Sequence, residues 1–192
     1  MSDVTLDDAK QAVKTLLSYI GEDPERDGLL DTPKRVVKAM KEMTEGYTED
    51  PSTILGVTFD VPFDQMVVLR DIPFVSMCEH HMLPFEGTAS VAYIPNGRVV
   101  GLSKLARVVD TFAKRYQVQE RLTQEIADAI NDHVDALGVG VIIKSRHTCM
   151  QYRGIKKSGL MVTSVTLGLM RTDLAARTEF LKLTGLSLIH IS

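Results

Sequence analysis

The sequence predicts an α+β fold, with an antiparallel sheet that is covered by helices on one side and preceded by a helical N-terminal region. Apolar residues recur at helical spacing through the N-terminal part of the chain, and they alternate in several shorter segments further on. Longer helical segments separate these strands in hairpin–helix–hairpin order, which is not the order of a doubly wound parallel sheet.

The N-terminal part contains two predicted helices. Thr5 is the predicted cap of the first, which carries its apolar residues at helical spacing and ends at Gly21. Thr32-Pro33 predicts the beginning of a second helix with an unusually basic outer side. The segment 50–63 is irregular, and we expect residues 1–64 to form an N-terminal helical region.

Residues 65–185 form the predicted main domain. The tight-turn sequence Pro95-Asn96-Gly97 predicts that the strand before it returns through Val99-Val100. Ser103 is the predicted cap of one helix, and Gly138 is the predicted end of another. The predicted elements are strands over 66–72, 87–94, 139–146 and 161–170, and helices from 103, over 119–137 and from Thr172 or Asp173.

The C-terminal segment Leu186–Ser192 shows no pattern that links it to the helix before it. It resembles the translation of a sequencing adapter, and we interpret residues 186–192 as a non-native tail. His190 therefore receives no functional role. A coding sequence that does not match the adapter at this point would contradict this hypothesis.

The composition limits the classes of partner. The chain has 192 residues, of which 44% are hydrophobic and 24% charged, and its net charge is −3. No global positive charge favours nucleic acid, so any anion site has to be built locally. No apolar run is long enough to span a bilayer, and the N-terminus lacks a signal pattern. We therefore expect a cytoplasmic protein that binds neither nucleic acid nor membrane.

Both cysteines lie in short clusters with histidine, Cys78-Glu79-His80-His81 and His147-Thr148-Cys149. In a reducing compartment such cysteines favour metal binding or catalysis over a disulfide. Catalytic zinc typically has three protein ligands and keeps a fourth position for water. The spacing of Cys78 and His81 lets one turn present both to an ion, and Cys149 could supply the third ligand. A pair of buried cysteines without metal is the alternative interpretation.

Two further pairs of residues are candidates for chemistry. His80 and His147 are adjacent to or two residues from a proposed ligand, so they are better placed as acid–base groups around a metal-bound water than as ligands. Gln119 and Glu120 begin a predicted helix, and a carboxylate next to an amide could bind the N–H donors of a guanine edge. An exposed glutamate that compensates the helix dipole is the alternative for Glu120.

A set of cationic and polar residues predicts an anion site. Helix beginnings favour anions through free N–H groups and the helix dipole, and arginine suits phosphate oxygens. Solvated surface charge is the alternative for each single residue. The sequence has no Walker A or G-x-G-x-x-G pattern, which excludes a standard nucleotide-binding loop. The candidates are Ser103, Lys104 and Arg107 at a predicted helix start, Arg153 after the second cluster, and Arg35 and Lys38 on the second helix.

Together these segments resemble GTP cyclohydrolase I. The blocks that carry the resemblance are SMCEHHMLPFEG, AYIPNGRVVGLSKLARVVDTFAKRYQVQERLTQEIADAI, HTCM-x-x-RGI, TPKRVVKAM and TEFLKL, and they cover most of the chain from about Leu6 to Leu183. The resemblance implies the tunnelling fold for residues 65–185, in which subunits join their sheets into a β-barrel. It also implies a homodecamer with active sites at subunit interfaces.

The resemblance further implies an activity and a role for each candidate residue. A zinc-activated water would attack C8 of the guanine of GTP. Ring opening, an Amadori-type rearrangement and reclosure would then give formate and 7,8-dihydroneopterin triphosphate. The implied zinc ligands are Cys78, His81 and Cys149, and the implied catalytic residues are His80, His147 and Ser103. The implied substrate-binding residues are Lys104, Arg107, Gln119, Glu120 and Arg153, with Arg35 and Lys38 from a neighbouring subunit.

The sequence also departs from the family. Ser90 stands where the family usually has histidine, Thr148 where a larger residue is common, and Gly159-Leu160-Met161 is more apolar than expected. Ser90 and Thr148 are neither proposed ligands nor acid–base groups, so they affect local packing more than activity. Two alternatives remain, an enzyme of the same fold that acts on a related purine or pterin, and a non-catalytic zinc-stabilised interaction module.

Overall fold

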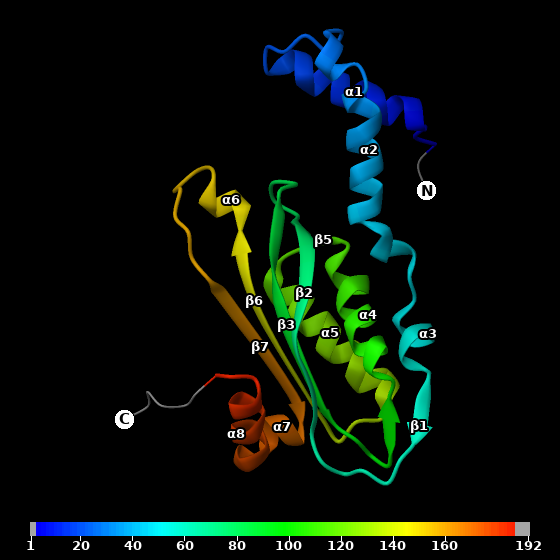
Figure 1. The fold of residues 1–192 in the computed structure, drawn as a ribbon, viewed down its shortest axis with the longest axis vertical. Helices are drawn as coiled ribbons and strands as arrows, with labels where there is room; N and C mark the ends of the chain where they lie inside the picture. The colour runs from blue at the N-terminus through cyan, green and yellow to red at the C-terminus, as the bar shows by residue number, and fades with distance from the viewer. Residues whose placement is uncertain (1–2, 187–192) are drawn as a thin grey trace. The chain divides into compact units, whose positions relative to one another are not determined.

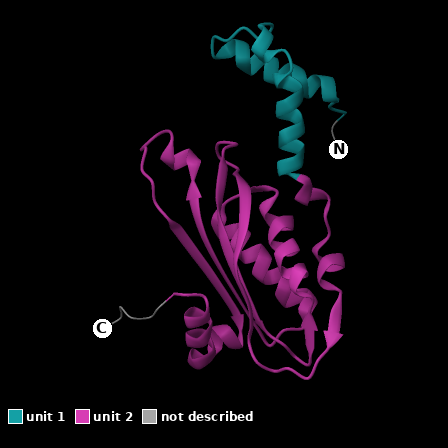
Figure 2. Cartoon of the chain, in the orientation of Figure 1, with its two compact units in different colours: residues 1–44 teal, residues 45–192 magenta. Residues whose placement is uncertain are grey.

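A computed structural model describes residues 3–186 of the chain. The chain divides into two compact units, residues 1–44 and residues 45–192 (Figure 2). The domain boundary predicted after residue 64 stays a prediction. The proposed non-native tail lies outside the described residues except for Leu186.

The N-terminal unit contains both predicted helices. The first begins with a capping box, because the Thr5 hydroxyl accepts from the backbone of Asp8 and the Asp8 carboxylate accepts from the backbone of Thr5. Pro33 lies in the first turn of the second helix, and Asp31, one residue before the predicted cap, occupies its N-cap position. The elements are α1 (Leu6–Tyr19), the 3-10 turn η1 (Asp27–Leu29) and α2 (Thr32–Met43).

The larger unit contains a five-stranded sheet of order β5-β2-β3-β6-β7 and a separate β1–β4 ribbon (Figure 1). All pairings are antiparallel except that of β2 with β5. The five strands are β2 (Val67–Cys78), β3 (Pro84–Ile94), β5 (Tyr116–Gln117), β6 (Gly138–His147) and β7 (Met161–Gly168). The other elements are η2 (Glu45–Thr48), α3 (Pro51–Leu55), β1 (Thr58–Asp60), β4 (Arg98–Val100), α4 (Leu102–Ala113), α5 (Gln119–Val134), α6 (Thr148–Gln151), α7 (Leu169–Thr172) and α8 (Leu174–Leu183).

The main core lies between the sheet and the helices α4 and α5, which confirms the predicted α+β class. Full burial of a valine, leucine, isoleucine, phenylalanine or methionine side chain stabilises the fold by about 1.5–3 kcal/mol. A smaller apolar cluster holds α7 and α8 on the opposite face through Met170 and Phe180. The buried helix residues follow the helical period that predicted them, and they include Leu105, Val108 and Phe112 on α4 and Leu122, Ile126 and Ile130 on α5.

The strand register positions the two segments that contain the candidate metal ligands, Cys78–His81 and His147–Cys149. Phe85 near the beginning of β3 lies opposite His147 at the end of β6. Met77 of β2 lies opposite Pro84, the first residue of β3. Cys78, which follows Met77, and His147 therefore lie at the same end of the sheet.

The region around the ribbon differs from the prediction. After the turn at Pro95-Asn96-Gly97, β4 pairs with β1 and not with β3, and the backbone N–H of Val100 donates to the hydroxyl of Tyr93. The segment predicted as irregular contains the short elements α3 and β1. Within residues 3–186, no helix is long and apolar enough to cross a membrane. The cytoplasmic location stays a prediction.

The helix ends also need correction. Ser103 lies inside α4, whose N-cap is Gly101 and has no side-chain hydrogen bond. The helix α5 ends at Val134 because Asp135 adopts a left-handed conformation with φ 52°. Gly138, predicted as the helix end, is already the first residue of β6.

Candidate metal centre and active site

The turn between β2 and β3 presents the first two candidate ligands, Cys78 and His81. The backbone N–H of Met82 donates to the carbonyl of Cys78 (2.9 Å), and the N–H of Cys78 donates to the carbonyl of Leu83 (2.8 Å). Met82 takes the left-handed conformation (φ 55°), which folds the chain back into β3. As a result, Nδ1 of His81 lies 3.9 Å from Sγ of Cys78.

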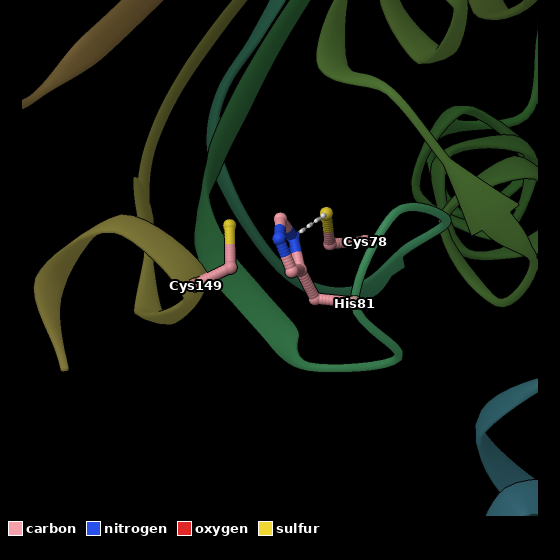
Figure 3. A group of neighbouring side chains, drawn as sticks. All are labelled: Cys78, His81 and Cys149. Atoms are coloured by element: carbon pink, nitrogen blue, oxygen red, sulfur yellow. Dashed lines mark hydrogen bonds between the residues drawn. The ribbon is translucent and has the colours of Figure 1, made fainter. Parts of the chain in front are cut away.

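Cys149 completes a group of three candidate ligands. Their ligand atoms all lie within 4.8 Å of one another, with Cys78 buried, Cys149 half-buried and His81 exposed (Figure 3). Zinc–sulfur bonds of about 2.3 Å and zinc–nitrogen bonds of about 2.0–2.1 Å require separations slightly shorter than this, so the three residues fit such an ion after small movements. Burial and the neighbouring Cys78 thiol raise the pKa of Cys149. A cation between the sulfurs is the natural way to hold both as thiolates.

Arg153 lies directly at this cluster. Its guanidinium Nη1 is 2.7 Å from Nε2 of His81 and donates to it. The other ring nitrogen of His81 faces Cys78, as the dashed line in Figure 3 shows. The structure therefore places a residue predicted to bind anions beside the candidate metal ligands.

A network behind the turn includes residues that the sequence analysis did not single out. Glu79 forms an ion pair with Arg121 of α5, which lowers the pKa of the Glu79 carboxylate. Arg121 also donates to the Gln117 side chain (3.0 Å) and to the backbone carbonyl of Tyr116 (3.1 Å). Arg121 thereby connects the turn between β2 and β3, called the metal turn below, to the first turn of α5. Because Glu79 lies between two proposed ligands, the sequence could have indicated that it supports them. Its partner Arg121 could not be identified in this way, since it lies 42 residues away.

His147 occupies a partly buried position at the same end of the sheet. Its ring stacks on Phe85 with 4.5 Å between the centroids and an interplanar angle of 8°. Burial lowers the pKa of His147, and the nearby Glu120 carboxylate opposes this shift. Glu120 is exposed, as is His80, whose ring lies 3.8 Å from the Glu79 carboxylate. The structure therefore brings His80, His147 and Glu120 to the metal end of the sheet.

Gln119 is placed differently from Glu120. Its side chain is 1% exposed, and its amide is fully used inside the protein. The amide nitrogen donates to the backbone carbonyls of Ile143 and Met161, and the amide oxygen accepts from Ser145 and lies 2.9 Å from His147. This arrangement leaves no amide atom of Gln119 free for a guanine edge.

The polar residues of α4 lie toward the other end of the sheet in the same chain. The strand β3 extends about 30 Å from Pro84 to Tyr93, at 3.3–3.4 Å per residue. α4 begins beside Tyr93, where β4 ends, and it runs toward β5 at the metal end (Figure 1). Arg35 and Lys38 lie on α2, in the N-terminal unit. The polar residues in the first two turns of α4 are Ser103, Lys104 and Arg107.

The two single-residue departures from the family make structural contacts. The Ser90 hydroxyl accepts from the backbone N–H of Asp71 (3.4 Å), which lies in the irregular part of β2 with φ 54°. The Thr148 hydroxyl donates to the carbonyl of Pro84 (2.5 Å) and so ties α6 to β3. Ser90 thus supports the irregular part of β2 in the middle of the sheet, and Thr148 supports the backbone next to Cys149.

The fold and the site are typical of one class of protein, an α+β enzyme with a candidate Cys2His metal site at the sheet end that also holds a partly buried histidine. A family model described as GTP cyclohydrolase I matches residues 9–185. The chain belongs to the GTP cyclohydrolase I family, which confirms the resemblance inferred from the sequence blocks.

Individual relatives agree with the family model. The GTP cyclohydrolase 1 of Pseudoalteromonas atlantica is 50% identical over 181 residues, which are 93% of this chain and 98% of that protein. The GTP cyclohydrolase 1 of Coxiella burnetii is 53% identical over 173 residues, which are 89% of this chain and 94% of that protein. Among solved structures, an archaeosine synthase QueF-Like in the apo form matches 52% of this chain and 91% of that chain, with 25% identity and a TM-score of 0.40. A score this low does not establish a shared fold.

The network behind the turn makes a prediction for metal binding. Arg121→Met should weaken zinc binding by less than the roughly 10- to 100-fold that loss of a direct partner of a metal ligand causes, because Arg121 acts on the turn through Glu79. Competition with a chromophoric chelator measures the affinity. Arg98→Met, which removes an exposed pair with Asp60 on the ribbon, is the matched control and should leave the affinity unchanged. Equal zinc affinity in the Arg121 variant and the wild type would contradict this role.

Proposed function

We propose that this chain hydrolyses GTP to formate and 7,8-dihydroneopterin triphosphate. Membership of the GTP cyclohydrolase I family supports the overall reaction. The observation that carries the proposal is the cluster of three candidate ligands at the same end of the sheet as a partly buried histidine. Three protein ligands with an open position are typical of a catalytic zinc site, whereas structural zinc sites are closed by four.

The proposed metal is zinc, held by Cys78, His81 and Cys149. Thiolate and imidazole ligands suit this ion. When bound, zinc supplies a water whose pKa is lowered toward neutrality. The remaining chemistry of the site belongs to side chains of the protein.

We assign the proton transfers to the two histidines that are not ligands. Burial lowers the pKa of His147 and so favours the uncharged ring, which can accept a proton and later return it as the imidazole portion of guanine opens. His80 lies in the same turn as two ligands and is proposed to assist. Glu120 is exposed near His147, and its carboxylate can accept the N–H donors of the guanine edge. Ser103 is proposed to assist the later rearrangement of the ribose.

We propose that each site uses residues from more than one copy of the chain, because the proposed phosphate-binding residues lie apart within one chain. Lys104 and Arg107 lie toward the far end of the sheet from Cys149 in the same chain, whereas Arg153 lies at the cluster. A second copy could bring its α4 to this cluster, and the N-terminal unit of a copy could supply Arg35 and Lys38. Arginine and lysine at a helix beginning suit the triphosphate.

The sheet itself favours assembly. Among the described residues, the outer edge of β7 has no strand partner, and β2 pairs on its outer side only through Met77 and Cys78. Such open edges are templates for pairing with another chain. We propose that copies join through these edges into the family's barrel, as a homodecamer.

A direct assay tests the reaction. The zinc-loaded protein should release formate from GTP and form a product with pterin absorbance. Cys149→Ala should lower the rate by more than the roughly 100-fold that loss of a partner behind a metal ligand causes. Circular dichroism and the size of the assembly control for folding. A folded, zinc-loaded wild type that forms no product would contradict the proposed function.

Mixed assemblies test the shared site. Cys149→Ala and Lys104→Ala should each be inactive alone, but co-assembly should restore roughly one quarter of wild-type activity, because random mixing leaves that fraction of two-copy sites intact. Co-assembly of Cys149→Ala with Cys78→Ala is the matched control, since both changes affect the same cluster, and it should restore nothing. If the first pair also restores nothing, the cations and the cluster do not come from different copies.

A further inference from the structure

The amide of Gln119 has a fixed orientation below His147. Its Nε2 lies 3.1 Å from the backbone carbonyl of Ile143 and 3.2 Å from that of Met161. Carbonyl oxygens only accept hydrogen bonds, so the amide end that faces them is the NH2 group. A flipped amide would place an oxygen against two carbonyl oxygens, which is unfavourable because neither of them can donate a hydrogen bond to it.

The other end of the amide determines the hydrogen position on His147. Oε1 of Gln119 is 2.5 Å from the Ser145 hydroxyl, which donates to it, and 2.9 Å from Nε2 of His147. The Ser145 oxygen is also 3.1 Å from Nε2 of His147, but its proton is already engaged with Gln119. Both neighbours of Nε2 are therefore acceptors, and Nε2 carries a hydrogen.

The second ring nitrogen is left free. Within residues 3–186, Nδ1 of His147 has no hydrogen-bond partner, and this part of the chain has no buried side-chain nitrogen or oxygen without one. Nδ1 therefore reaches solvent at the metal end of the sheet. Stacking on Phe85 fixes the plane of the ring. In a neutral ring with hydrogen on Nε2, the lone pair is on Nδ1.

We propose that Gln119, together with Ser145, is a positioning residue that holds a hydrogen on Nε2 of His147 and leaves Nδ1, the nitrogen that reaches solvent, as the proton acceptor of the reaction. The catalytic part of this inference rests on the proposed function, whereas the tautomer rests on the hydrogen-bond geometry. Gln119 then acts through His147 without touching the substrate. Glu120 alone of the pair is left to bind guanine through its side chain.

Nitrogen-15 spectra of the zinc-loaded protein, labelled at histidine, test the tautomer directly. His147 is assigned by the signal that is lost in His147→Gln. The wild type should show a protonated Nε2 and an unprotonated Nδ1 at a pH where the ring is neutral. Gln119→Met, which removes the acceptor at similar volume, should give a mixture of tautomers. It should also lower kcat by at least about 10-fold with KM for GTP nearly unchanged, because a wrong tautomer can cost a catalytic histidine up to roughly 10⁴-fold.

Two further variants keep the test independent of folding defects. Ser145→Ala removes the other neighbour of Nε2 but leaves Oε1 of Gln119 as its acceptor, and it should keep the wild-type tautomer and most of the wild-type kcat. Gln124→Met is the matched control, since Gln124 lies on the exposed side of α5 and pairs with Asp128 (2.8 Å), and it should change neither spectrum nor kinetics.

Distinct results would overturn the two parts of the inference. A wild-type spectrum with hydrogen on Nδ1 would overturn the tautomer whatever the enzyme's activity. A raised KM in Gln119→Met, with kcat and the spectrum unchanged, would show that Gln119 binds substrate instead. A wild type with the Nε2–H tautomer but no GTP turnover would overturn the proposed function and its catalytic consequence, and would leave the tautomer standing.

Discussion

The site depends on the register of β3 between β2 and β6. This register places Cys78 at the end of one neighbouring strand and His147 at the end of the other, on either side of the first residues of β3. A slip of one residue would turn every side chain of a strand to the opposite face of the sheet. Phe85 would then no longer stack on His147, and the sulfurs of Cys78 and Cys149 would separate. The apolar core below α4 and α5 prevents this slip, because the same strands bury their inward residues there.

The first turn of α5 organises both halves of the site. Gln119 reaches between β6 and β7 and orients His147, while Arg121, half a turn further, holds Glu79 in the metal turn. Neither residue is proposed to react with the substrate. Both hold other side chains in place, and a multi-step reaction requires such rigid positioning. The buried part of this network is fully hydrogen-bonded, which avoids the cost of unpaired polar groups in a low dielectric.

Local signals in the sequence predicted most of the fold and the metal cluster. Helical periodicity identified α1, α2, α4 and α5, and in α4 and α5 the periodic apolar residues form the buried stripe. The spacing of Cys78 and His81 predicted their convergence because one turn contains both residues. By contrast, β1 and β4 have three residues each, too few for a period to be visible. Gly138 carries the same signal for a helix end and for a strand start, and only the tertiary structure separates the two.

Long-range contacts could not be predicted from the sequence in the same way. The ion pair of Glu79 with Arg121 joins residues far apart in the chain. The burial of Gln119 depends on the gap between β6 and β7, which no local pattern describes. The position of Lys104 at the far end of the sheet follows from the direction of α4 and could not be inferred from its charge.

X-ray absorption at the zinc edge of the zinc-loaded protein without GTP tests the central claim, that the two strand ends build an open three-ligand centre. The account predicts two sulfur ligands at about 2.3 Å, one imidazole nitrogen at about 2.0–2.1 Å and one further oxygen from water. Two sulfurs with two imidazoles would describe a closed structural site, and a spectrum without sulfur would place the metal elsewhere. Either result would contradict the account.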